Sequence, residues 1–344
     1  MTVKKIDGAT LNQWVDGLSA GQKVYGPCAK EDRFVFGPLS GAADLRLDYD
    51  VTLLPPKKYF LPQKEVLLKF SRKGKFESVI DDEPFVLFGV HPYDFVGIEQ
   101  LNKIFSSNQY DTHYMARSKA ATIVVCDVEN ASAEVFAACM GHATVEDREG
   151  FDVLLTKLDD ESYMVDARTE KGEALVAPLA DVPEADADSL RLRERVWDRN
   201  RKALRKHELK TAPGEIPALL EGAQDHPVWA EKAEQCYSCG SCNLVCPTCY
   251  CFDVQDELNW DMETGQRYRT WDGCMLAEFA AVAGGHNFRD RQAARYRHRY
   301  NRKGLYMWDS IGEIACVGCG RCITACTAKI ANPVEVYNRL LEEA

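Results

Sequence analysis

Two groups of cysteines with the same internal spacing are the residues of this sequence best suited to chemistry. The first group has the spacing C-x2-C-x2-C-x3-C and is followed by Pro247. The second repeats the same gaps further along the chain, with Thr327 in place of the proline. The groups are Cys236, Cys239, Cys242 and Cys246, and then Cys316, Cys319, Cys322 and Cys326. This is the spacing of bacterial ferredoxins that hold two iron–sulfur clusters.

The spacing also predicts which cysteines share a cluster. Two residues between ligands let a tight loop present three thiolates to one cluster, while the fourth cysteine lies too far along the chain and ligates the other cluster. We therefore expect two 4Fe–4S clusters, one at Cys236, Cys239, Cys242 and Cys326, and one at Cys316, Cys319, Cys322 and Cys246. The alternative is a pair of zinc sites, which rarely use a third cysteine at a repeated gap.

Three further cysteines belong to neither group: Cys249, Cys251 and Cys274. Together with His286 or Asp272 as a fourth ligand they could hold a third iron–sulfur cluster, since ligands other than cysteine occur at such centres. A second interpretation is that they are small buried apolar residues. A third is a labile thiol pair close to the clusters. The sequence leaves these alternatives open.

The elements that must position these cysteines indicate an α+β protein. Five strand-like segments precede the cysteines, at residues 34–39, 65–70, 84–90, 121–128 and 151–158. Residues 92–105 have helical spacing, and a second helix is expected at 189–208 after an acidic connector. Cys126 in a strand and Cys139 in a helical stretch are expected to be core residues. The sequence around Cys28 gives no basis for predicting its role. The fold class is a mixed α/β N-terminal domain followed by a ferredoxin-like domain for two 4Fe–4S clusters.

These segments suggest domain boundaries. We expect the mixed α/β domain at residues 1–210, a linker at 211–231 that contains Pro213 and Gly214, and the dicluster domain at 232–344. A long helical insertion, residues 250–312, is expected between the two cysteine groups. No glycine-rich fingerprint for a dinucleotide or a phosphate follows any strand, so no nucleotide or flavin is expected on this chain.

Composition narrows the class of protein. The formal net charge is −11, which argues against a general nucleic-acid binder, because the phosphate backbone selects for basic surfaces. No apolar run is long enough for a membrane-spanning helix, and the first residues do not have the pattern of a signal peptide. A cytoplasmic location is expected, where fourteen reduced cysteines indicate metal binding rather than disulfides.

One basic run stands out against this acidic background. Residues 289–303 contain seven Arg or Lys residues and a single Asp. The run could be a solvated helix face, a docking surface for an acidic partner protein or for cofactor phosphates, or a nucleic-acid contact. The segment 53–65, which is apolar at Tyr59, Phe60 and Leu61, is expected to pack onto the N-terminal domain.

Several segments together resemble one family of proteins. They are CGSCNLVCPTCYCFDV (239–254), RTWDGC (269–274), FAAVAGGHNFR (279–289), RYRHR (295–299) and ACVGCGRC (315–322), with LLPPKKYFLPQ (53–63) and FGVHPYDF (88–95) upstream. The chain resembles the iron–sulfur β subunit of cytosolic NAD(P)-linked nickel–iron sulfhydrogenases and the A subunit of anaerobic sulfite reductase. A similar chain occurs in flavin oxidoreductase complexes that serve heterodisulfide reductase.

The resemblance implies a non-catalytic electron-transfer subunit. Its partners would be a subunit that binds FAD and NAD(P)H and a terminal catalytic subunit of the hydrogenase, sulfite reductase or heterodisulfide reductase type. The resemblance implies that the eight grouped cysteines are cluster ligands. Four further residues match the family in sequence, but the resemblance does not fix their role: Cys249, Cys251, Cys274 and His286. An enzyme with a substrate-binding third cluster and an iron–sulfur nucleic-acid binder are the competing interpretations.

Overall fold

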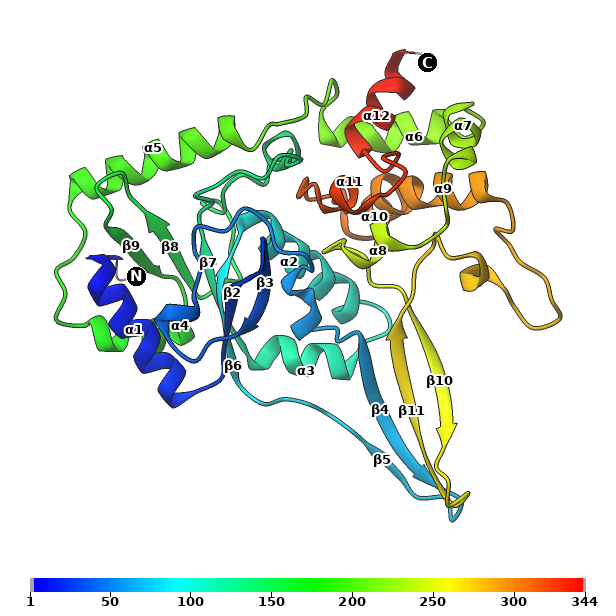
Figure 1. The fold of residues 1–344 in the computed structure, drawn as a ribbon, viewed down its shortest axis with the longest axis horizontal. Coiled ribbons are helices and arrows are strands. Elements are labelled where there is room, and N and C mark those ends of the chain that lie inside the picture. The colour runs from blue at the N-terminus through cyan, green and yellow to red at the C-terminus, as the bar shows by residue number, and fades with distance from the viewer. Residues whose placement is uncertain (1–2, 343–344) are drawn as a thin grey trace.

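The computed structural model describes residues 3–342 and contains two β-sheets and a helical region (Figure 1). A seven-stranded sheet with helices on both faces forms one half of the molecule. A four-stranded sheet projects from the other half, below the helices that follow residue 212. No helix among residues 3–342 is long and apolar enough to cross a bilayer.

The seven-stranded sheet is parallel in its middle and antiparallel at its edges. Its order is β1 (Val3–Ile6), β9 (Tyr163–Ala167), β8 (Val153–Lys157), β7 (Ala121–Cys126), β6 (Phe85–Val90), β2 (Val24–Lys30) and β3 (Arg33–Pro38). All six residues of β6, FVLFGV, are buried. A continuous apolar strand of this kind is typical of a central parallel strand covered on both faces.

Helices cover the two faces of this sheet because alternate strand residues point to opposite sides. One face packs against α1 (Gly8–Gly21) and α4 (Glu170–Val176) through Val86, Phe88 and Val124. The other packs against α2 (Pro92–Ser106), α3 (Thr112–Ala120) and α5 (Ala187–Ala203) through Leu87 and Val125. Helix α5 begins two residues earlier than expected, because the Asp186 side chain accepts a hydrogen bond from Ser189 N and caps it, and it ends at Ala203 rather than at 208.

The four-stranded sheet joins two segments that are far apart in the sequence. Its antiparallel order is β10 (Phe252–Leu258), β11 (Thr264–Trp271), β4 (Lys64–Ser71) and β5 (Phe76–Ser78). At its base, buried Glu65 on β4 is ion-paired with Arg269 on β11 and with Arg117 on α3. The insertion at 250–312, expected to be helical, therefore begins with a β-hairpin. It becomes helical at α9 (Gln292–Asn301), a π-helical segment (Arg302–Tyr306) and α10 (Met307–Ile311).

The helical region surrounds the cysteine-rich loops. Its remaining helices are α6 (Ile216–Gly222), α7 (Val228–Glu234), α8 (Ser241–Leu244), α11 (Arg321–Ala325) and α12 (Pro333–Glu342). Residues 211–231, expected to be a linker, contain α6 and the first turn of α7. Ile216, Leu220 and Trp229 from this segment are buried in the core of the region. The segment is therefore a packed part of the fold that carries the cysteines.

Short 3₁₀ helices complete the secondary structure. They lie at Ala42–Asp44, Pro56–Tyr59, Ala137–Met140, Ala177–Leu179, Pro213–Glu215 and Ala277–Ala280. The second of these belongs to the apolar segment 53–65, in which Phe60 and Leu61 are fully buried in the N-terminal core, as expected from the sequence. Cys126 is buried in β7, and Cys139 lies in the third 3₁₀ helix, packed against the core of the helical region.

Candidate functional site

The first three cysteines of the first group surround one cavity with the last cysteine of the second group. The cavity is lined by Cys236, Cys239, Cys242 and Cys326, together with Met275, Tyr296 and Ile330. The three early cysteines lie on the loop between α7 and α8 and on α8 itself, and Cys326 directly follows α11. Cys239 is exposed to solvent. We call these four cysteines the outer set.

The other four grouped cysteines line a second cavity, which is deeper in the protein. Cys246, Cys316, Cys319 and Cys322 surround it together with Arg299 and Lys303. Cys246, Cys319 and Cys322 are each less than a tenth exposed. We call these four cysteines the inner set. The structure thus brings together the two sets of four that the spacing predicts.

Close packing against the N-terminal domain fixes the loop of the inner set. Gly318 and Gly320 have left-handed backbone conformations, with φ of 72° and 77°. A Cβ atom at Gly318 would lie 2.6 Å from the backbone of Ala137, and one at Gly320 would meet the backbone of Glu134. Phe136 N also donates a hydrogen bond to Gly318 O at 2.8 Å. Only glycine satisfies both the conformation and the close approach.

The chemistry of these cavities fits iron–sulfur clusters. Among residues 3–342, no three His, Cys, Asp or Glu side chains converge on one point as the ligands of a single ion do. Each set of four cysteines lines a cavity instead. Burial raises the pKa of the Cys242, Cys316 and Cys319 thiols to about 12. Such thiols lose their protons at neutral pH only when a metal or another positive charge compensates the thiolate.

The three remaining cysteines lie close to the grouped ones, with Cys249 beside Cys246 of the inner set and Cys274 near Cys242 of the outer set. Asn243 Nδ2 lies 3.4 Å from Cys274 Sγ and 3.6 Å from Cys249 Sγ, close enough to donate to both sulfurs. Burial, and after it the neighbouring Cys274, raise the pKa of Cys251 to about 11. Asp272 N donates to Cys251 O at 3.0 Å, so this carboxylate residue lies beside the group.

His286 lies elsewhere. It is exposed on the loop that follows the 3₁₀ helix Ala277–Ala280, and its ring packs edge-on against Phe288 with the ring centroids 4.7 Å apart. Of the two fourth ligands considered from the sequence, the structure therefore brings Asp272 to the three cysteines and holds His286 against Phe288.

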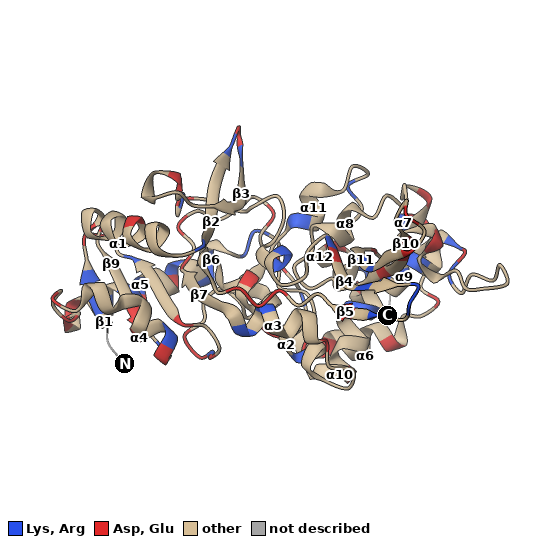
Figure 2. Ribbon diagram, turned by 90° about the horizontal axis from the view of Figure 1, so that it is seen from below, with Lys and Arg blue, Asp and Glu red and all other residues tan. Residues whose placement is uncertain are grey.

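Part of the basic run is buried beside the cysteines rather than solvated. Charges of both signs are interspersed along the whole molecule (Figure 2). Within the run 289–303, however, Arg295, Arg299 and Lys303 are buried. Lys303 Nζ donates to Cys246 Sγ at 3.1 Å, and Arg299 lines the inner cavity. The four-residue spacing of these three cations was the signal in the sequence that they share one helix face.

Two more polar residues near the cysteines were not predicted. Asn243 is buried between Cys249 and Cys274, as described above. Lys57, from the apolar segment 53–65, is also buried, and its Nζ donates to Cys249 O at 2.6 Å and lies over the Trp271 ring. Burial lowers the pKa of Lys57 to about 8.

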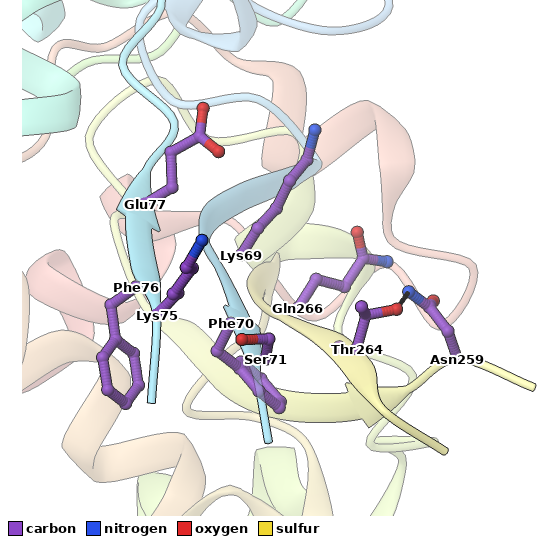
Figure 3. Close-up of a pocket in the computed structure, with 10 residues that line it drawn as sticks. Lys69, Phe70, Ser71, Lys75, Phe76, Glu77, Asn259, Thr264 and Gln266 are labelled. Carbon is purple, nitrogen blue, oxygen red and sulfur yellow. Dashed lines mark hydrogen bonds between the residues drawn. The ribbon is translucent and has the colours of Figure 1, made fainter. Parts of the chain in front are cut away.

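A separate groove of about 760 Å³ lies along the projecting sheet (Figure 3). It is lined by residues of β4, β5 and β11, including Lys69, Phe70 and Gln266. Its lining contains a single carboxylate, Glu77, and neither cysteine nor histidine. One carboxylate alone does not make a metal site, and the groove lacks the thiols and imidazoles of a redox site, so the candidate site is at the cysteine cavities.

Comparison with known proteins agrees with this location. Residues 235–330 match the model of the 4Fe–4S dicluster domain. Over 343 residues, the chain is 34% identical to a protein of Pyrococcus furiosus described as sulfhydrogenase 2 subunit beta, and the match covers 99% of both chains. No solved structure matches the chain.

Proposed function

The chain belongs to the sulfhydrogenase β-subunit family, and we propose that it carries single electrons between a flavin subunit that reacts with NAD(P)H and a catalytic subunit. The observation that carries this proposal is the pair of neighbouring cavities, each lined by four cysteines from both groups. A 4Fe–4S cluster supplies one-electron chemistry, whereas NAD(P)H delivers a hydride, so the relay needs a flavin partner.

The protein would determine where each cluster lies and what surrounds it. The outer set lies at the surface through Cys239, where a partner can approach. The inner set is enclosed between α9, α11 and the N-terminal domain. The outer set is therefore the proposed point of exchange with a partner subunit, and the inner set the proposed continuation of the path toward Cys249, Cys251 and Cys274.

The partners follow from the family. The name of the Pyrococcus furiosus relative describes a β subunit of a sulfhydrogenase. We propose that this chain likewise works in a multisubunit complex whose terminal subunit is of the hydrogenase type, with sulfite reductase and heterodisulfide reductase types as the alternatives. The large number of unpaired cysteines supports a cytoplasmic location. Reduction of the chain by a flavin donor, and not by NAD(P)H alone, is the test of the relay.

We also propose that a third iron–sulfur centre is bound by Cys249, Cys251 and Cys274, with Asp272 as the fourth ligand. The support is the grouping of the three thiols around Asn243 and Asp272, with the buried amino group of Lys57 beside them. A buried amino group is costly without a negative charge close to it. An anionic centre held by three thiolates would provide that charge.

Iron analysis tests the third centre. The anaerobically purified chain is expected to contain about twelve iron and about twelve acid-labile sulfide ions, four of each per cluster. Cys274→Ala and Asp272→Ala are expected to lower both counts to about eight, because the third centre loses a ligand. His286→Ala and Cys28→Ala are the matched controls and should keep the wild-type content. A Cys274→Ala chain with wild-type iron would contradict the third centre and leave the two-cluster relay intact.

A further inference from the structure

Three buried cations form a line along one face of α9 and the π-helical segment after it. Arg295, Arg299 and Lys303 are four residues apart and are 6%, 2% and 7% exposed. Arg295 Nη2 donates to Ser238 Oγ at 3.1 Å, on the loop of the outer set. Arg299 lines the inner cavity, and Lys303 contacts Cys246 of the inner set. The line thus runs from the outer set to the inner set.

The π-helical segment helps to direct Lys303 at the inner set. Residues four apart drift around the axis of a regular α-helix, which has 3.6 residues per turn. The wider turn of a π-helix reduces this drift, and π-helical turns are frequent at functional sites. The segment Arg302–Tyr306 is held in place at Gly304, where a Cβ atom would collide with side chains of Leu220 and Ile216.

The buried ammonium group of Lys303 has no ion pair with a carboxylate in the part of the chain that the structure describes. Its Nζ donates to Cys246 Sγ at 3.1 Å and to Thr248 Oγ1 at 2.9 Å, and it lies 3.4 Å from Ala315 O. Among residues 3–342, no Asp or Glu oxygen lies within 4.0 Å of it, and the same holds for Arg299, whose Nε has no hydrogen-bond partner. Arg321 differs, since it is paired with Asp94. A buried cation needs a counter-charge, and for Lys303 the nearest candidates are the thiolates of the inner set.

The hydrogen bonds to sulfur in the outer set come from neutral donors, although the buried guanidinium of Arg299 lies close enough to Cys242 to favour its thiolate. Cys236 Sγ accepts a hydrogen bond from Ser238 N at 3.4 Å, and Cys239 Sγ lies 3.3 Å from Ser241 Oγ. Both donors are neutral, and Arg295 reaches this loop through Ser238 rather than through a sulfur. Lys303 thus places a charged donor 3.1 Å from a cysteine sulfur of the inner set, and Arg299 adds a second buried cation beside Cys322.

We propose that Lys303 is a positioning residue that raises the reduction potential of the cluster at the inner set, by holding a fixed positive charge against the sulfur of Cys246. Accepting one electron adds one negative charge to this site. A nearby ammonium group in a medium of low dielectric constant stabilises that added charge, and hydrogen bonds to the sulfurs act in the same direction. The inference rests on the proposed two-cluster relay.

Redox titration followed by electron paramagnetic resonance tests this role on the full chain, with dithionite as reductant. Lys303→Met removes the charge and keeps the length of the side chain. We expect it to retain wild-type iron while the potential of one cluster falls by at least about 59 mV, a tenfold change in the equilibrium for one electron. Lys303→Arg should restore most of that potential. Arg297 lies on the same helix but donates to Gln224 O, so Arg297→Met should leave the reduction potential of every cluster unchanged.

The outcomes separate this proposal from the relay itself. Wild-type iron with unchanged potentials in Lys303→Met would overturn the role of Lys303 and leave the relay standing. If Lys303→Met does not retain the clusters of the outer and inner sets, Lys303→Gln provides the comparison, because it removes the charge but keeps a hydrogen-bond donor. An unchanged reduction potential in Lys303→Gln would equally overturn the proposal. A wild-type chain that holds no iron–sulfur cluster would instead overturn the proposed function.

Discussion

Replacing Cys326 with alanine is expected to remove the cluster of the outer set and leave the cluster of the inner set. Cys326 is the last cysteine of the second group in sequence, but it lines the cavity of the first three cysteines of the first group. Cys246 shows the opposite relation, because it lines the cavity of the second group. Each substitution should therefore lower the iron content by about four per chain, the content of one 4Fe–4S cluster.

The identity of the lost cluster is the decisive measurement. The paramagnetic resonance spectrum of reduced Cys326→Ala should match that of Cys236→Ala, and the spectrum of Cys246→Ala should match that of Cys316→Ala. Cys28→Ala replaces a cysteine outside the outer set, the inner set and the proposed third centre, and serves as the control with an unchanged spectrum. A Cys326→Ala spectrum that matches Cys316→Ala would mean that each sequence group holds its own cluster.

Replacing Asp94 with alanine is expected to destabilise the protein by about 3–5 kcal/mol, because it leaves a buried guanidinium without its counter-charge. Arg321 lies beside Cys322 and is 2% exposed at its side chain. It forms a two-pronged ion pair with fully buried Asp94 on α2, at 2.5 and 2.6 Å. It also donates to Thr52 O at 2.8 Å. This ion pair ties the loop of the inner set to the N-terminal domain.

Urea denaturation of the full chain measures this effect. Asp48→Ala is the matched control, because its ion pair with Arg46 lies at the surface, where such pairs contribute little. Replacing Asp94 and Arg321 together with apolar residues should recover much of the lost stability, since no unpaired charge then remains buried. An Asp94→Ala protein that unfolds at the wild-type urea concentration would show that the guanidinium finds another counter-charge.

The sequence was most informative where a pattern is local. The apolar run of β6, the helical spacing of α2 and the two cysteine groups each lie within a short stretch, so their periodicity or spacing predicts the element. The α+β class with a C-terminal dicluster domain and the family resemblance are confirmed by the comparisons. Which cysteines share a cavity also followed from local spacing, because a tight loop limits what each thiolate can reach.

The sequence was least informative where partners are distant. The pairing of β4 with β11 joins Lys69 to Gln266, and nothing in either strand identifies the other. The segment 211–231 contains the proline and glycine typical of a linker, but Ile216 and Leu220 are four residues apart and form the buried face of a helix. All three alternatives considered for the basic run, a solvated face, a docking surface and a nucleic-acid contact, kept its charges at the surface, because charges usually stay in water. The thiolates that would compensate Arg299 and Lys303 lie on other loops.

Anaerobic reductive titration of the purified wild-type chain tests the central claim most directly. We predict that dithionite or a chemically reduced flavin reduces the clusters in one-electron steps, that an oxidant reverses this, and that NADH and NADPH alone reduce nothing until a flavin subunit is added. A chain that contains metal but no acid-labile sulfide, or clusters that NADPH reduces without a flavin, would contradict the account of this protein as an electron relay.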